Sequence, residues 1–399
     1  MKPLPLRFRM LNALGGALQK MGLQIAPLRI DRLQQKAIKQ SGLSDFGDPR
    51  YEEGLRVLVQ SAEEDANLHT LGRLIYKNMI IDKLVNRLKW VDAQKSKPEW
   101  FTEPIIPPLI VTGLPRSGTT LLHRLLALDP SHRAIPAWEM THPFPSESKE
   151  ARRIKAVKEL AFLQKLAPEL DRKHEIRADK PEECLFLMAS TFTSFYFWGL
   201  APVYGYMEWY MTQDMAPKYH QYKGYLHILQ NVDPTKRLTL KAPIHRHAIH
   251  TLYQTIPNAM IIQTHRDPVR VVNSMNSLIS SLHRMVCTQD IPRMARMTLE
   301  IQSKFTLQNL EQRQKMPNVI FDIYYPELVA NPIQTVRNIY DHFALPWPDG
   351  HHKRLQSYMK ENKQGKYGTH SYSSEKFGLT DDEIRRQFTD YLHAFGKHL

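Results

Sequence analysis

The chain has 399 residues, of which 42% are hydrophobic and 24% are charged. These values are ordinary for a globular protein and exclude a wholly disordered chain. The formal net charge of +14 favours an anionic ligand, such as a nucleotide or an acidic membrane surface. No zinc-finger, basic-zipper or aromatic RNA-binding motif occurs, so nucleic acid is not expected as a partner.

The two cysteines, Cys184 and Cys287, are far apart and lack metal-ligand spacing. This pattern argues against a disulfide scaffold or a structural zinc site and is typical of a protein in a reducing cytoplasm. The sequence therefore predicts a cytoplasmic protein.

Residues 1–30 are basic and carry apolar residues at irregular helical intervals. The segment has neither the continuous apolar core of a membrane span nor a convincing signal-peptide cleavage site. It is predicted to be an amphipathic helix packed on the rest of the chain. Peripheral contact of this basic segment with an anionic membrane is the alternative.

Residues 45–90 show helical periodicity, and prolines then gather between Pro98 and Pro108. Each proline denies the backbone a helical hydrogen bond. We therefore expect an N-terminal helical cap over residues 1–104 and an α/β domain over residues 105–399.

Leu109 to Thr112 form an apolar, β-branched strand pattern, and a leucine-rich helix pattern follows Thr120. A loop between such elements directs backbone N–H groups and the positive end of a helix dipole at an anion. The spacing of its glycines matches a Walker P-loop, but the position of the Walker lysine holds threonine. The loop's cation is an arginine, which suits a phosphate-linked group without a Mg²⁺-triphosphate. The predicted ligand-binding residues are Arg116, Ser117, Gly118, Thr119 and Thr120.

The run from Pro115 to Thr120 resembles the 5′-phosphosulfate-binding loop of the sulfotransferases that use 3′-phosphoadenosine 5′-phosphosulfate (PAPS). Its arginine resembles the bacterial branch and the tyrosylprotein enzymes, whereas the cytosolic animal enzymes carry lysine. The resemblance implies a P-loop-type three-layer α/β fold, with a central parallel sheet flanked by helices. It also implies PAPS as donor co-substrate and requires no metal.

Glu139 follows the helix after this loop and resembles, with a short insertion, the catalytic glutamate of the tyrosylprotein enzymes. A carboxylate at this place would serve as a general base for an acceptor hydroxyl or amine. A surface glutamate beside Trp138 is equally compatible with the sequence.

Residues 184–207 carry no charge and are dense in aromatic side chains. Serines, threonines, glycines and a proline interrupt the stretch, which argues against a membrane span. We expect a buried helix lining a pocket for a small, apolar or lipid-like acceptor, with plain core packing as the alternative.

The pattern from Leu238 to His245 indicates a short strand that ends in a cation and an imidazole. Side chains at such a strand end face the crevice where open α/β sheets bind ligands. Lys241 is predicted to contact the sulfuryl oxygens, and His245 to accept the acceptor's proton. In the resembled cytosolic enzymes the histidine lies nearer the lysine, where this chain has Pro243, so His245 is a displaced candidate.

The next strand pattern, 259–266, ends in Arg266, and Ser274 lies within the helix that follows. This pair resembles the family's 3′-phosphate site. Tyr325, the last residue of a final strand pattern at 318–325, resembles the family's tyrosine near the adenine. The basic segment 360–372 loosely resembles a loop over the nucleotide.

Together these motifs predict sulfuryl transfer from PAPS to a hydroxyl or amine. Arg116 and Lys241 would stabilise the transition state, and Glu139 or His245 would remove the acceptor proton. Two alternatives remain at this stage. A P-loop phosphotransferase would need Mg²⁺ and a Walker lysine, and a non-catalytic nucleotide- or membrane-binding protein would need neither base.

Overall fold

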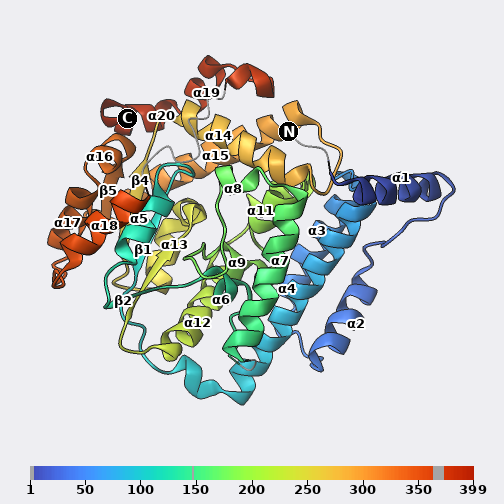
Figure 1. Ribbon diagram of the computed structural model, residues 1–399, viewed down its shortest axis with the longest axis horizontal. Helices are drawn as coiled ribbons and strands as arrows, with labels where there is room; N and C mark the ends of the chain where they lie inside the picture. The colour runs from blue at the N-terminus through green and yellow to red at the C-terminus, as the bar shows by residue number, and fades with distance from the viewer. Residues whose placement is uncertain (1–3, 146–147, 363–372) are drawn as a thin grey trace.

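The computed structural model describes residues 4–145, 148–362 and 373–399. Most of the basic segment predicted to cover the nucleotide therefore lies outside the described residues. At the centre is a five-stranded, fully parallel sheet of order β2-β3-β1-β4-β5 (Figure 1). Its strands are β1 (Leu109–Gly113), β2 (His132–Ala134), β3 (Arg237–Lys241), β4 (Met260–His265) and β5 (Ile320–Tyr324). The predicted α/β fold with a central parallel sheet is confirmed, although β2 was not predicted.

Successive residues of β1 pack into two different cores. Leu109 and Val111 belong to one apolar cluster and Ile110 to the other, because side chains alternate between the faces of a strand. A parallel sheet covered on both faces accounts for the continuous apolar run of this strand. Helices on both faces complete the three layers.

The helices on the Leu109 face are α5 (Thr119–Leu126), α16 (Tyr325–Ala330), α17 (Pro332–His342) and α18 (His351–Glu361). The Ile110 face is covered by η3 (Pro243–Ala248), α12 (Ala216–Val232), α13 (Ile249–Thr255) and α15 (Ile291–Arg313). Beyond them, α14 (Pro268–His283) packs with two C-terminal helices, α19 (Asp381–Gln387) and α20 (Thr389–Phe395).

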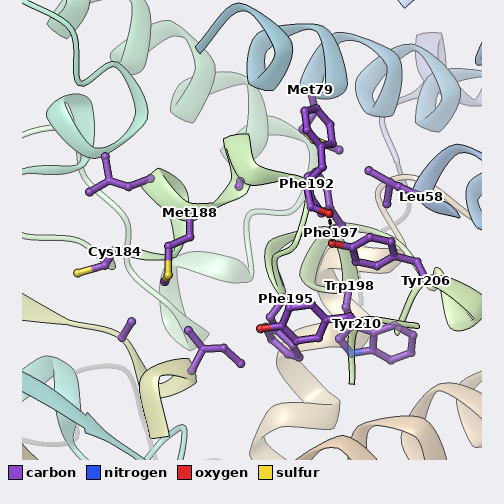
Figure 2. Packing of buried hydrophobic residues seen from close by; sticks show 14 of the residues in the cluster. Leu58, Met79, Cys184, Met188, Phe192, Phe195, Phe197, Trp198, Tyr206 and Tyr210 are labelled. Atoms are coloured by element: carbon purple, nitrogen blue, oxygen red, sulfur yellow. Dashed lines mark hydrogen bonds between the residues drawn. The ribbon is translucent and has the colours of Figure 1, made fainter. Parts of the chain in front are cut away.

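The N-terminal part is helical, as expected. Its helices are α1 (Leu6–Lys20), α2 (Ile30–Ser41), α3 (Arg50–Glu64) and α4 (Thr70–Ser96). Leu58 of α3 and Met79 of α4 share one apolar cluster with the aromatic segment and with residues of the sheet (Figure 2). At Gly54 a Cβ atom would lie 2.4 Å from the Phe192 carbonyl oxygen, so α3 can approach that segment only with glycine there.

The aromatic segment is not the single buried helix that was predicted. It forms α9 (Leu185–Met188), η2 (Ala189–Thr191), α10 (Tyr196–Leu200) and α11 (Tyr204–Tyr210). The helical backbone is interrupted at Phe192, which has a left-handed φ of 57°. Its carbonyl accepts a 2.8 Å hydrogen bond from the Tyr206 hydroxyl. Most of its rings pack into the core, as Figure 2 shows for Phe197 and Trp198.

Three further helices connect the sheet to this aromatic core: α6 (Ala137–Thr141), α7 (Lys149–Leu166) and α8 (Leu170–Lys173). Figure 1 shows α7 running beside α4, with α8 following near the top of the view. Among the described helices, none is both long and apolar enough to cross a membrane.

Candidate active site

The predicted phosphate-binding motifs follow neighbouring strands. Val111 of β1 is paired with Lys241 of β3 on one side and with Ile262 of β4 on the other. All three strands are parallel, so the segments after them leave the sheet at the same edge. Arg116, Lys241 and Arg266 therefore belong to one edge, where ligands of open α/β sheets bind.

The loop after β1 needs its two glycines. Gly113 has φ of 128°, and a Cβ atom there would lie 2.2 Å from the Thr264 carbonyl oxygen. Gly118 has φ of 90° and directly precedes α5. This backbone turns the loop toward the N-terminus of α5, where N–H groups and the helix dipole favour an anion.

Arg116 also has a positive φ, of 64°, which is costly for a residue with a side chain. Two contacts hold it in place. Its Nε donates a 3.1 Å hydrogen bond to the Ser274 hydroxyl, and its carbonyl accepts one from the Arg266 guanidinium. The loop and the predicted 3′-phosphate motif are therefore in direct contact.

Ser117 has a structural role through its side chain. Its hydroxyl is buried, donates to the Leu114 carbonyl and is hydrogen-bonded to the Thr264 hydroxyl. Its backbone N–H is the group that a phosphate-binding loop would use. Thr119 and Thr120 open α5, where their N–H groups have no intrahelical acceptor.

Arg266 lies over the Tyr325 ring, with its guanidinium carbon 4.0 Å from the ring centre. The stacking fixes the plane of the guanidinium beside the loop. The Tyr391 hydroxyl of α20 accepts a 3.3 Å hydrogen bond from the Arg266 backbone N–H. Sequence analysis missed Tyr391, because nothing in its local sequence shows that a C-terminal helix supports the end of β4.

Lys241 is almost fully buried, with 1% of its side chain exposed, and it is paired with carboxylates. Its Nζ lies 2.7 Å from Glu183 Oε1 and 3.8 Å from Glu182 Oε1. The Cys184 N–H donates a 3.0 Å hydrogen bond to the Lys241 carbonyl, which brings this segment to the end of β3. The adjacent carboxylates Glu182 and Glu183 were not predicted, because their approach to Lys241 depends on a hydrogen bond between segments that are far apart in the sequence.

Two histidines complete the surroundings of Lys241. His174 Nε2 lies 3.6 Å from Glu182 Oε1, and the charges of His174 and Lys241 outweigh burial and lower the pKa of Glu182. His123 Nε2 donates a 2.9 Å hydrogen bond to the Thr239 carbonyl, and burial, followed by the Lys241 charge, lowers the pKa of His123 to about 4. We name His174, Glu182, Glu183 and Lys241 the Lys241 cluster.

Three members of this cluster offer metal ligands. One atom each of His174, Glu182 and Glu183 lie within 4.8 Å of one another. The Lys241 ammonium, however, already contacts Glu183, and a cation in that place opposes a second one. In this arrangement the Lys241 ammonium already supplies the positive charge that these carboxylates need.

The two predicted bases occupy different environments. Glu139 in α6 is buried, and both of its carboxylate oxygens lie 2.7 Å from one Arg133 nitrogen. His245 is buried between the rings of Tyr219 and Tyr222, and its Nδ1 is hydrogen-bonded to the Tyr219 hydroxyl at 3.0 Å. Burial lowers the pKa of His245 to about 3. These contacts favour structural roles for both residues.

A strand, a glycine-containing anion loop and a helix at the edge of a parallel sheet place the protein among the P-loop-type α/β proteins. More specifically, the chain belongs to the Sulfotransferase family, whose sequence profile matches residues 107–349. Family membership makes it an enzyme that transfers a sulfuryl group from a donor co-substrate. Neither the phosphotransferase nor the non-catalytic alternative is supported.

Solved structures of two mycobacterial sulfotransferases are similar to this chain. STF1 from Mycobacterium tuberculosis H37Rv is 30% identical, with a TM-score of 0.81 over 92% of this chain and 100% of that one. STF9 from Mycobacterium avium is 26% identical, with a TM-score of 0.83 over 92% of this chain and 96% of that one. The likeness extends through most of the chain, well beyond the phosphate loop.

A further relative has a named acceptor. The omega-hydroxy-beta-dihydromenaquinone-9 sulfotransferase Stf3 of Mycobacterium bovis is 24% identical over 285 residues. The match covers 69% of this chain and 72% of that protein.

Proposed function

We propose that the enzyme takes its sulfuryl group from PAPS. The observation that carries this proposal is the contact between Arg116 of the loop and Ser274 of α14, beside Arg266. Two anion-binding motifs at one sheet edge suit a nucleotide with a phosphate at each end. Arg266 and Ser274 would bind the 3′-phosphate, Tyr325 would lie near the adenine, and the loop from Arg116 to Thr120 would bind the 5′-phosphosulfate.

In the proposed reaction an oxygen or nitrogen of the acceptor attacks sulfur, and the bond from sulfur to the bridging phosphate oxygen breaks. Negative charge develops on that oxygen, and adenosine 3′,5′-bisphosphate leaves. The loop N–H groups, Arg116 and Lys241 would stabilise this charge. Fixed donors in a water-poor site make such stabilisation effective.

The acceptor proton needs a base near Lys241. Glu139 and His245 remain predictions, but Glu139 is engaged by Arg133, and His245 lies among buried tyrosines. We propose Glu183 instead, because it contacts Lys241 and keeps 19% of its side chain exposed. When Lys241 turns to the sulfuryl oxygens, the Glu183 carboxylate is released to accept the proton.

We propose a lipid-like alcohol as the acceptor. The named relative acts on a menaquinone derivative that carries a terminal hydroxyl. This chain has a large cavity with apolar and polar walls, and its lining includes Phe186 of the segment that carries Glu183. Peripheral contact of the basic N-terminal segment with an anionic membrane belongs to the same proposal, because such an acceptor dissolves in lipid.

Calorimetry tests the donor assignment. We expect adenosine 3′,5′-bisphosphate to bind in the presence of a chelator, and ATP with Mg²⁺ to bind at least tenfold more weakly. Tighter binding of ATP with Mg²⁺, or a need for a divalent ion, would contradict PAPS as the donor.

A further inference from the structure

A cavity of about 580 Å³ lies between α4 and α7. Sites for small organic ligands typically enclose roughly 300–1,000 Å³. At one end the lining from α4 is apolar, with Leu74 and Ile75, and α7 contributes Leu160 and Leu163 to the lining. The other end is polar, because Asp82 of α4 pairs there with Lys155 of α7 at 4.0 Å. The cavity is therefore large enough for a ligand and amphipathic along its length.

The polar end contains a buried cation. Lys83 is 5% exposed, and its Nζ lies 4.8 Å from the centre of the Tyr196 ring. Burial lowers the pKa of Lys83, and the charges of the Asp82 and Glu159 carboxylates oppose this shift. Asp82 also pairs with Lys155 at 4.0 Å. A buried ammonium needs hydrogen-bond acceptors, and an oxygen of a bound ligand would provide one.

The apolar end is closed by α1, which contributes Phe8 and Leu11 to the cavity wall. The Phe8 ring meets the Phe162 ring of α7 edge to face at 6.0 Å. Figure 1 shows α1 projecting from the edge of the molecule. The cavity therefore ends under a helix that projects from the edge of the molecule.

The outer face of α1 is apolar and basic. Of the ten large apolar side chains exposed in the described residues, five lie on α1 and the turn after it, and three lie on α7. Leu6, Met10 and Leu14 follow one another along one side of α1, with Arg7 and Arg9 between them. A surface helix normally buries its apolar stripe, whereas a basic helix with an exposed one suits an anionic lipid surface.

One segment of the chain contributes both to the cavity and to the Lys241 cluster. Ile176 and Phe186 line the cavity, and they lie on the same segment that places His174 and Glu183 beside Lys241. A ligand in the cavity therefore lies against the segment that carries the proposed base.

We propose that this cavity binds the long hydrocarbon chain of the acceptor alcohol, which enters from a lipid phase past α1. The inference rests on the proposed function, because it assumes an apolar acceptor. It adds two points to that function: the hydrocarbon chain binds against the apolar residues of α4 and α7, and it enters past α1.

Fluorescence titration with cis-parinaric acid tests the site without relying on turnover. The probe has a long hydrocarbon chain and a carboxylate that Lys83 can receive. Ile75→Trp and Leu163→Trp each place a larger side chain in the wall of the apolar end. Leu307→Trp is the matched control, because Leu307 is an exposed residue of α15. Adenosine 3′,5′-bisphosphate is titrated into the same samples.

We expect each cavity variant to raise the probe's Kd at least tenfold, with Leu307→Trp unchanged and bisphosphate binding intact in all proteins. If both cavity variants bound the probe with the same Kd as the unchanged protein, the proposed site would be overturned. So would a failure of the unchanged protein to bind the probe. If the unchanged protein did not bind the bisphosphate, the proposed donor would be refuted. The titration with cis-parinaric acid would still decide whether the cavity binds a hydrocarbon chain.

Discussion

Replacing Arg266 by alanine separates two ways in which this residue can act. Its guanidinium stacks on Tyr325 and donates to the Arg116 carbonyl, so it is placed both to bind a phosphate and to hold the loop. A hydrogen bond to a charged group contributes roughly 1.5–3 kcal/mol. At about 1.4 kcal/mol per tenfold change, loss of one such bond weakens binding about 10- to 150-fold.

The assay is calorimetry with adenosine 3′,5′-bisphosphate and with adenosine 5′-phosphate, which lacks the 3′-phosphate. If Arg266 binds the 3′-phosphate, the variant loses affinity for the bisphosphate and changes little toward the monophosphate. Arg270→Ala is the control, since Arg270 is exposed on the first turn of α14. Equal losses for both nucleotides would refute the 3′-phosphate assignment and leave Arg266 only its support of the loop.

Two predictions concern stability. Gly54→Ala should lower the free energy of unfolding by about 1–3 kcal/mol in urea titration, because the new Cβ meets the Phe192 carbonyl. Gly16→Ala, where no atom lies within 4 Å of such a Cβ, should instead raise it by about 0.5–1 kcal/mol, and the same sign for both would contradict the packing. Burial lowers the pKa of His245 to about 3 in the folded protein, whereas the unfolded chain has the ordinary value of about 6.5. As the pH falls below about 6.5, His245 therefore takes up a proton only in the unfolded chain, and the free energy of unfolding should fall by up to about 1.4 kcal/mol per pH unit. His245→Gln should remove that share of the slope between pH 7 and pH 5.5, and an unchanged slope would show that His245 is not buried in its neutral form.

The sequence was sufficient where function depends on contiguous residues. The strand, glycines and arginine from Leu109 to Thr120 specify a local geometry, and Arg266 and Ser274 belong to one strand and its helix. Parallel pairing of β1 with β4 then brings the two motifs together. The local geometry indicates an anionic ligand without identifying it, and the family resemblance suggested PAPS, the donor proposed above.

The Lys241 cluster could not be predicted in this way. Glu183 reaches Lys241 because a distant segment is hydrogen-bonded to the end of β3 through Cys184. His245 follows the same strand in sequence, but Tyr219 and Tyr222 of α12 enclose it. In both cases the partner comes from another element of the structure. Closeness to Lys241 in the sequence therefore indicated His245 as the base, whereas the residue in contact with Lys241 is Glu183.

The aromatic segment shows a different limit. An uncharged, aromatic stretch has the same composition whether it lines a pocket or fills a core. Here Phe186 and Tyr196 line the cavity, whereas Phe197 and Tyr206 pack against each other in the core. The backbone turn at Phe192 and contacts with other elements, such as Phe195 with Phe305 of α15, determine where each ring lies.

Double-variant analysis tests whether Lys241 and Glu183 form an ion pair in the protein before the donor binds. Removing one partner of a buried ion pair typically costs about 3–5 kcal/mol, whereas removing both is often nearly neutral. Here Glu183 keeps 19% of its side chain exposed, and Lys241 keeps the Glu182 carboxylate at 3.8 Å, so we expect losses below that range. Lys241→Met and Glu183→Gln should therefore each lower the free energy of unfolding, and the double variant should be more stable than the sum of the two losses allows. Urea unfolding of the four proteins measures the coupling, and sulfuryl transfer should be lost in all three variants. Additive losses of stability would show that the ammonium and the carboxylate do not form the pair seen at 2.7 Å, and that Glu183 is not held ready by Lys241.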